Sequence, residues 1–130
     1  MATECRPEII DAALTAATSV HTALGPGLLE SIYQTALAHE LRSAGLQIAT
    51  EVPMAVSYRG IDLGIGYRAD IIVAGQLILE IKSVSRIDAA HVSQLLTYLR
   101  LSGIRLGFIL NFNHRLLKHG IKRVTDFHSP

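Results

Sequence analysis

Two carboxylates and a lysine lie close together in the middle of this 130-residue chain. Asp70 falls in an apolar, strand-like run, and Glu80 and Lys82 close the next such run. If the two runs pair as a hairpin across a loop at positions 74–76, Asp70 faces Glu80 and both carboxylates lie on one face of the sheet. Lys82 is two positions beyond Glu80 and shares that face. A tighter loop would shift the pairing by one residue and separate the carboxylates.

These residue types suit the metal-dependent hydrolysis of a phosphodiester. Mg²⁺ and Mn²⁺ prefer oxygen ligands and keep several waters, so one or two carboxylates suffice to hold either ion at a substrate. The ion acidifies water and neutralises the charge that builds on the phosphate. A neighbouring lysine can orient the water, assist its deprotonation or stabilise the phosphate. Asp70 and Glu80 are therefore candidate metal ligands, and Lys82 is the candidate catalytic residue that acts on the attacking water.

An ordinary ion-pair cluster on a surface hairpin would contain the same three residues, since short motifs match by chance. The flanking positions argue against this alternative. Residues 71–73 and 77–79 are all aliphatic and are typical of interior strands. Charged side chains in interior strands require a specific reason, because burial of an unpaired charge is costly.

Motifs on both sides of these residues resemble a known family. Gln94 and Tyr98 follow in a helical stretch, and the order Asp, Glu-x-Lys, Gln-x-x-x-Tyr resembles the PD-(D/E)XK nuclease superfamily, in particular its RecB-like exonuclease branch. Upstream, the segment with Gly27, Glu30 and Tyr33 resembles the signature of the small bacterial GxxExxY family, which is assigned to that superfamily.

The resemblance covers the chain from about position 9 to position 113. It implies a metal-dependent DNA nuclease with the element order ααβββαβ. It also implies that Glu30 approaches the metal as an accessory acid, and that Gln94 and Tyr98 line the site and contact the DNA backbone or nearby waters. The proline of the superfamily's name is replaced by Ala69. Since proline is no metal ligand, this departure leaves the chemistry intact.

Each supporting residue also has a structural interpretation. Glu30 could be a solvated glutamate favoured by a helix dipole. Gln94 and Tyr98 share a helical face and could serve only a partly buried helix. Tyr33 is expected to pack, with its hydroxyl bonded to a buried partner, and Gly27 to permit a positive φ before the helix.

Further basic and imidazole groups lie near the motifs. By strand alternation, Arg68 shares a face with Asp70 and could clamp a phosphate or pair with a carboxylate. The segment 114–123 contains Arg115, Lys118, Lys122 and Arg123 and no acid, which suits either phosphate binding or a solvated face. His91 lies one turn before Gln94 and is expected to be a surface histidine rather than a ligand.

The hydrophobic pattern predicts the same order of elements without the resemblance. It favours helices at 7–23, at 28–44 and from 88 or 89 to 101. It favours a strand from 48 toward the turn at 59–60, further strands at 61–73, 77–82 and 105–111, and a short final strand at 124–127. Pro7 suits the first turn of a helix, Gly45 caps the second helix, and Pro53 places its strand at an edge or bulge. We therefore expect one domain, 1–130, with an α/β (α+β) fold in which a central mixed sheet is flanked by helices.

Composition limits the remaining choices. Hydrophobic residues make up 49% of the chain and charged residues only 18%, which predicts a homo-oligomer that covers some apolar surface. A net charge of +1 gives no overall positive field. The single cysteine, Cys5, excludes an internal disulfide and a four-cysteine iron–sulfur cluster. The chain shows neither a signal-peptide pattern nor an apolar run of membrane-spanning length, so we expect a cytoplasmic protein without a membrane partner.

Together these features predict a Mg²⁺- or Mn²⁺-dependent nuclease that acts on DNA, with RNA as an open alternative. A second function remains open as well. The chain could be a non-catalytic, oligomeric binding or assembly protein that retains the nuclease fold.

Overall fold

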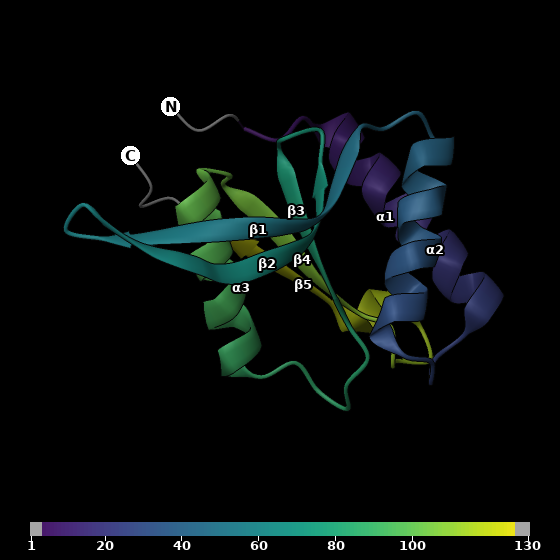
Figure 1. The fold of residues 1–130 in the computed structure, drawn as a ribbon. Coiled ribbons are helices and arrows are strands. Elements are labelled where there is room, and N and C mark those ends of the chain that lie inside the picture. The colour runs from purple at the N-terminus through teal and green to yellow at the C-terminus, as the bar shows by residue number, and fades with distance from the viewer. Residues whose placement is uncertain (1–3, 127–130) are drawn as a thin grey trace.

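The computed structural model describes residues 4–126. The elements follow the predicted order ααβββαβ with the predicted final strand after it, and a short 3-10 helix is added before that strand (Figure 1). They are α1 (Pro7–Leu24), α2 (Glu30–Ser43), β1 (Ile48–Tyr58), β2 (Ile61–Val73), β3 (Leu77–Lys82), α3 (Ala89–Ser102), β4 (Leu106–Asn111), η1 (Leu117–Gly120) and β5 (Ile121–Thr125).

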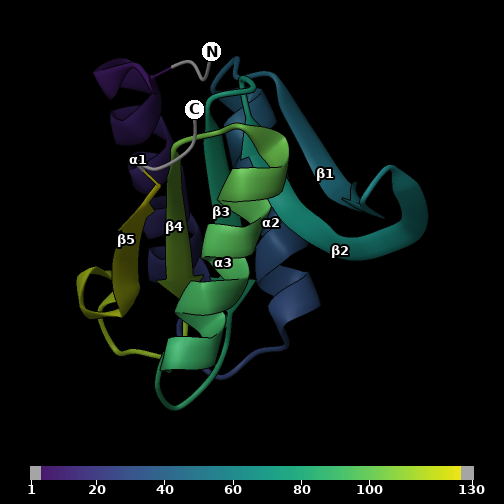
Figure 2. The same ribbon diagram turned by 90° about the vertical axis from the view of Figure 1, so that its left-hand side faces the viewer.

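The strands form one mixed sheet in the order β1-β2-β3-β4-β5. Neighbouring strands are antiparallel except β3 and β4, which run parallel. A parallel pair needs a crossover connection, and α3 supplies it. α3 covers one face of the sheet, whereas α1 and α2 cover the other (Figure 2). The predicted fold class, a mixed sheet flanked by helices, is therefore confirmed.

Alternation along β3 divides its side chains between the two faces. Ile81 packs with α1 and α2, whereas Ile78 packs with α3. Glu80 and Lys82 follow Ile78 at intervals of two, so they lie on the face that α3 covers. The predicted helix with Gln94 and Tyr98 is thus the helix that faces these charges.

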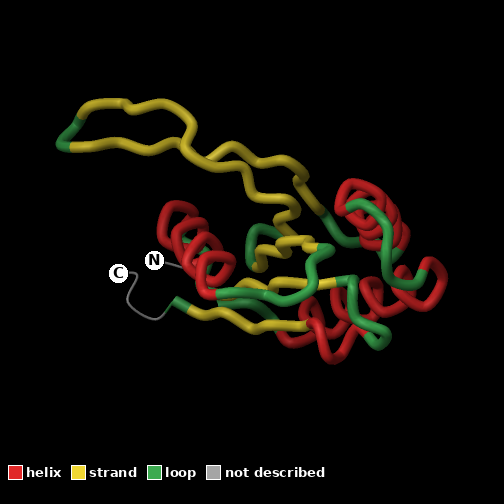
Figure 3. The backbone as a smooth tube through the Cα atoms, turned by 90° about the horizontal axis from the view of Figure 1, so that it is seen from below, coloured by secondary structure: helices red, strands yellow, loops and turns green. Residues whose placement is uncertain are grey.

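β1 and β2 form a long hairpin whose far end projects from the rest of the fold (Figure 3). Its ladder has two register shifts, and at each one β2 contributes one residue more than β1. Glycines lie at both bulges. Gly64 has φ +90°, a conformation that other residues rarely adopt, and a Cβ on Gly66 would lie 2.6 Å from a Val56 methyl. β1 is an edge strand, as Pro53 predicts.

The C-terminal part differs from the prediction. The last strand begins at Ile121 rather than at Val124, and Phe127 lies outside the described residues. Lys122 and Arg123 are exposed on this edge strand, where charges discourage pairing with other chains. Because these two charges interrupt the apolar alternation, the sequence pattern does not indicate the first residues of β5. α2 also begins later than predicted, at Glu30, because Leu29 has an extended backbone.

Candidate active site

Asp70 and Glu80 meet where β2 separates from β3. Val73 pairs with Leu77, as the predicted loop requires, and the backbone ladder ends before it reaches Asp70. There, Asp70 Oδ2 accepts a hydrogen bond of 2.8 Å from the Ile81 amide. The Asp70 amide donates one of 3.3 Å to Glu80 Oε1. The two carboxyl groups thus take the place of missing ladder bonds and lie side by side.

The pair is shielded from water, since Glu80 is 4% exposed and Asp70 is half-buried. Burial, followed by the neighbouring Asp70 charge, raises the pKa of Glu80 from 4.5 to about 9. Burial also raises the pKa of Asp70, against the lowering effect of its hydrogen bonds with Glu80 and the Ile81 amide. A proton on Glu80 relieves the repulsion between the two groups, and a divalent cation can take its place. Two adjacent carboxylates therefore fit a hard cation such as Mg²⁺ or Mn²⁺.

Lys82 ends β3 and is half-buried. Its charge lowers the pKa of both Asp70 and Glu80, so the ammonium group lies within electrostatic reach of the pair. In the described part of the chain it forms no ion pair with either carboxylate. The ammonium therefore acts on the two carboxyl groups through its charge rather than through a direct ion pair.

Tyr98 is brought to the carboxylates from α3. It is 4% exposed, and burial together with the charges of Glu80 and Asp70 raises its pKa. The Tyr98 ring meets the ring of Tyr67 edge-on, with centroids 5.2 Å apart. Gln94, one turn earlier, is half-buried and lines a groove with Tyr67. The predicted pair Gln94 and Tyr98 thus lies on the site's side of α3.

Glu51 is a neighbour of the site that the sequence did not indicate. It lies between Thr50 and Val52, whose strand partners flank Asp70, and it has φ +51°. Its charge raises the pKa of Asp70. The Gln34 side chain of α2 donates to Glu51 Oε1 at 2.7 Å and to the Asp70 carbonyl at 3.4 Å. Gln34 therefore ties α2 to the strand that carries Asp70.

Glu30 holds the chain that leaves β3. Its Oε2 accepts a hydrogen bond of 2.9 Å from the Ser83 amide, and Ser83 Oγ donates to the Leu28 carbonyl at 2.8 Å. Among residues 4–126, no group of three His, Cys, Asp or Glu side chains is arranged to hold a metal ion. The observed contacts of Glu30 thus position the segment after Lys82, and its role as a metal ligand remains a prediction.

Tyr33 and Gly27 shape the turn before α2. The buried Tyr33 hydroxyl donates to the Gly25 carbonyl at 2.5 Å and accepts from the Leu28 amide at 3.1 Å. Its ring stacks on Phe112, with centroids 4.5 Å apart. Gly27 has φ +99°, as predicted from its position. The segment from Gly27 to Tyr33 therefore connects this turn, α2 and the loop after β3.

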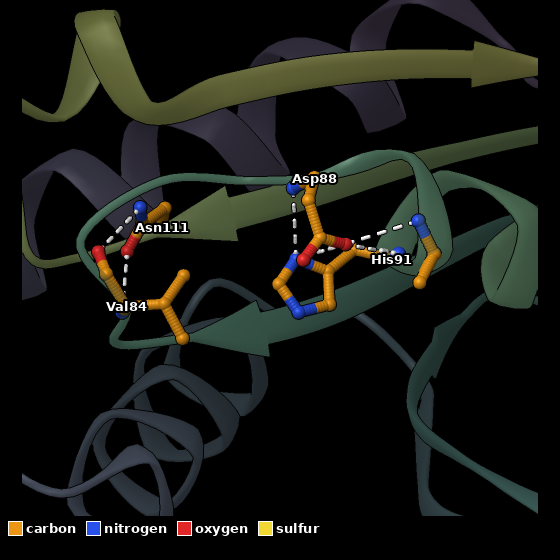
Figure 4. Close-up of polar contacts among 5 residues, drawn as sticks. Val84, Asp88, His91 and Asn111 are labelled. Carbon is orange, nitrogen blue, oxygen red and sulfur yellow. Dashed lines mark hydrogen bonds and ion pairs between the residues drawn. The ribbon is translucent and has the colours of Figure 1, made fainter.

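Asn111 and Asp88 organise the loop between β3 and α3 (Figure 4). The fully buried Asn111 accepts from the Val84 amide at 3.1 Å and donates to the Val84 carbonyl at 2.9 Å. Asp88 Oδ1 accepts a hydrogen bond from the His91 amide, and His91 Nδ1 accepts one from the Asp88 amide. His91 is therefore part of a helix cap, and sequence reasoning missed Asn111 because an asparagine that ends a strand has no distinctive pattern.

Arg68 is exposed and, within residues 4–126, forms no ion pair with Asp70 or Glu80. The sequence placed Arg68 on the same sheet face as Asp70 because side chains alternate along a strand, but this alternation is interrupted at Asp70. Ala69 packs with the α3 cluster, whereas Ile71 packs with α1 and α2. Regular alternation would have put both on one face.

A family model of the PD-(D/E)XK nuclease superfamily matches residues 7–124. The chain therefore belongs to this superfamily. No curated protein and no solved structure matched it. Among the helices of residues 4–126 there is no candidate membrane-spanning segment.

Proposed function

We propose that this protein is a Mg²⁺- or Mn²⁺-dependent nuclease that cleaves DNA, with Asp70 and Glu80 as metal ligands and Lys82 as the residue that acts on the attacking water. The observation that carries the proposal is the buried Asp70–Glu80 pair at the end of the β2–β3 ladder, within a chain of the PD-(D/E)XK superfamily. Within that superfamily, the segment from Gly27 to Tyr33 and the pair Gln94 and Tyr98 support the GxxExxY family and the RecB-like branch.

Each residue has a defined task in this proposal. Asp70 and Glu80 hold the cation, which supplies charge stabilisation at the phosphodiester and acidifies water. The Lys82 ammonium orients the water or stabilises the phosphate, since it lies near the carboxylates without pairing with them. Tyr98 closes one side of the site, and Glu30 supports it through Ser83 or as an accessory ligand.

The proposal is tested by incubating purified protein with linear and circular DNA in Mn²⁺ and in a chelator. We expect cleavage in Mn²⁺ only, and we expect Asp70→Asn to abolish it because the metal site loses a charged ligand. Asp11→Asn, which changes an exposed carboxylate on α1, is the matched control and should cleave like the wild type. Equal activity of wild type and Asp70→Asn would leave the non-catalytic assembly protein as the function. RNA in place of DNA in the same assay tests the other nucleic acid.

We further propose a cytoplasmic homo-oligomer. Among the described residues, several large apolar side chains of the β1–β2 hairpin are exposed, including Ile61, Leu63 and Ile65. A contiguous exposed apolar surface is typical of an interface. The sequence left two candidate interfaces, the first helix and the apolar side of the edge strands. The hairpin is the better one, because the apolar side of α1 packs on the sheet.

A further inference from the structure

A groove lies next to the proposed active site, between the base of the projecting hairpin and α3. It has a volume of about 570 Å³ and is lined by Tyr67, Ala90, His91, Ser93, Gln94 and Thr97. It adjoins the site, because the Tyr67 ring that lines it meets the Tyr98 ring with centroids 5.2 Å apart, and Tyr67 lies on the same strand as Asp70. A nucleotide at the carboxylates would therefore have this groove beside it.

The chemistry of the lining suits a nucleobase rather than a phosphate. Among the described residues that line the groove there is no lysine, arginine or carboxylate, so a phosphate would lack a charged partner. Hydroxyl and amide groups of Ser93, Gln94 and Thr97 offer hydrogen bonds without net charge. The Tyr67 side chain is 37% exposed, so part of it is accessible from the solvent. An aromatic ring next to uncharged polar groups is the combination that binds unpaired bases.

We propose that this groove binds an unpaired base of single-stranded nucleic acid, stacked on Tyr67, while the adjoining phosphodiester lies at Asp70 and Glu80. The proposal rests on the proposed nuclease function and adds a preference for single strands. In a duplex the base is stacked and paired, and its removal from the helix costs a few kcal/mol. A base of a single strand enters the groove without most of that cost.

The test measures binding by fluorescence anisotropy of a labelled oligonucleotide in a chelator, so that no cleavage occurs. We expect the single strand to bind more tightly than the duplex of the same sequence. Tyr67→Ala should weaken single-strand binding about tenfold, within the range known for base–aromatic stacking. Tyr67→Phe keeps the ring and should stay within about twofold of the wild type. Leu116→Ala changes an exposed position outside both the groove lining and the hairpin and is the control.

Because Tyr67 also contacts Tyr98, a second measurement uses the unaltered protein. An oligonucleotide with 5-iodouracil is photocrosslinked to the wild type, and the attachment site is mapped by mass spectrometry. We expect the crosslink at Tyr67 or at another residue that lines the groove. A crosslink confined to other elements would overturn the proposal.

Equal affinity for single strand and duplex, or wild-type affinity in Tyr67→Ala, would also refute it. If the wild type is an oligomer that binds no single strand, a second copy of the chain occupies this surface and the proposal fails. Failure of the nuclease function is a separate result, since it would appear as absent cleavage in Mn²⁺ with single-strand binding retained. If wild type and Tyr67→Ala both cleave duplex and single strand at equal rates, the proposed base binding in the groove is wrong and the proposed nuclease function stands.

Discussion

The Asp70 amide donates a hydrogen bond to the Glu80 carboxyl group at the point where the β2–β3 ladder ends. The Asp70 carboxylate accepts a hydrogen bond from the backbone amide of Ile81, the residue after Glu80. Each acid therefore replaces a backbone partner that the diverging strands no longer provide. Because both groups are tied to strand backbone, the sheet itself determines their separation, and it holds together two acids that repel each other when both are ionised.

We predict that metal binding depends on the Asp70–Glu80 pair. We expect Mn²⁺ to bind the wild type and to raise its thermal stability, since a ligand that binds only the folded state stabilises it. The double variant Asp70→Asn, Glu80→Gln should lose both effects, as measured by titration calorimetry and thermal melts. Asp11→Asn should behave like the wild type. Equal Mn²⁺ affinity in the double variant would place the metal elsewhere.

The metal-free protein should lose stability as the pH rises. Burial raises the pKa of Glu80 from 4.5 to about 9, so the folded state holds a proton that the unfolded chain releases. Stability from this proton is complete below pH 4.5 and is lost progressively as the pH approaches 9. Thermal melts in a chelator between these values should show a falling midpoint. Glu80→Gln, which cannot ionise, should flatten the slope, and an unchanged slope would show that another group is responsible.

Saturating Mn²⁺ should change the pH dependence of the thermal stability. A metal ligand must be deprotonated, so binding releases the proton from Glu80 and the apparent affinity rises with pH. We therefore expect calorimetry in two buffers of different ionisation enthalpy to report proton release on binding. No proton release at neutral pH would mean that Glu80 is already ionised or is not a ligand.

The element order, the loop at 74–76 and the meeting of Asp70 with Glu80 could all be predicted, because aliphatic runs and a short loop define one register. Glu51 could not. An unbroken ladder from the turn at Arg59 and Gly60 would place Glu51 opposite Arg68. Two bulges in β2 move it opposite Asp70, and its positive φ has no signature in a glutamate. Bulges and side-chain hydrogen bonds such as those of Asn111 depend on tertiary packing, which local patterns do not contain.

Asn111 should be important for stability although it carries no proposed chemistry. Asn111→Ala would leave the half-buried backbone N–H and C=O of Val84 without their partner, at a cost of up to about 1–3 kcal/mol for each unsatisfied group. We expect a clear fall in the unfolding midpoint by calorimetry, and weaker metal binding because the loop after Lys82 loosens. Asn113→Ala, at an exposed position, is the control. A midpoint like that of the control would mean that water replaces the amide.

The projecting hairpin should hold the oligomer together. Leu63 is 60% exposed, and a polar substitution there removes apolar area that a second copy could cover. We expect light scattering to give an oligomer for the wild type and a shift toward 14.1 kDa for Leu63→Ser. Leu101→Ser changes an exposed leucine of α3 and should not alter the mass. A wild type that remains a monomer at high concentration would contradict the prediction.

Substitution of Lys82 tests whether the protein is an active nuclease or a non-catalytic protein that retains the nuclease fold. The Lys82 ammonium cannot ligate a cation, so Lys82→Ala should leave Mn²⁺ binding nearly intact while the cleavage rate falls by about 10² to 10⁴. Lys82→Arg should restore little, because a guanidinium stays protonated and differs in reach. The rates are compared on linear and circular DNA with Mn²⁺, and calorimetry on the same samples verifies metal binding. If wild type and Lys82→Ala cut at the same rate, the cleavage comes from a contaminating nuclease, and the assembly-protein function becomes the better explanation of the fold.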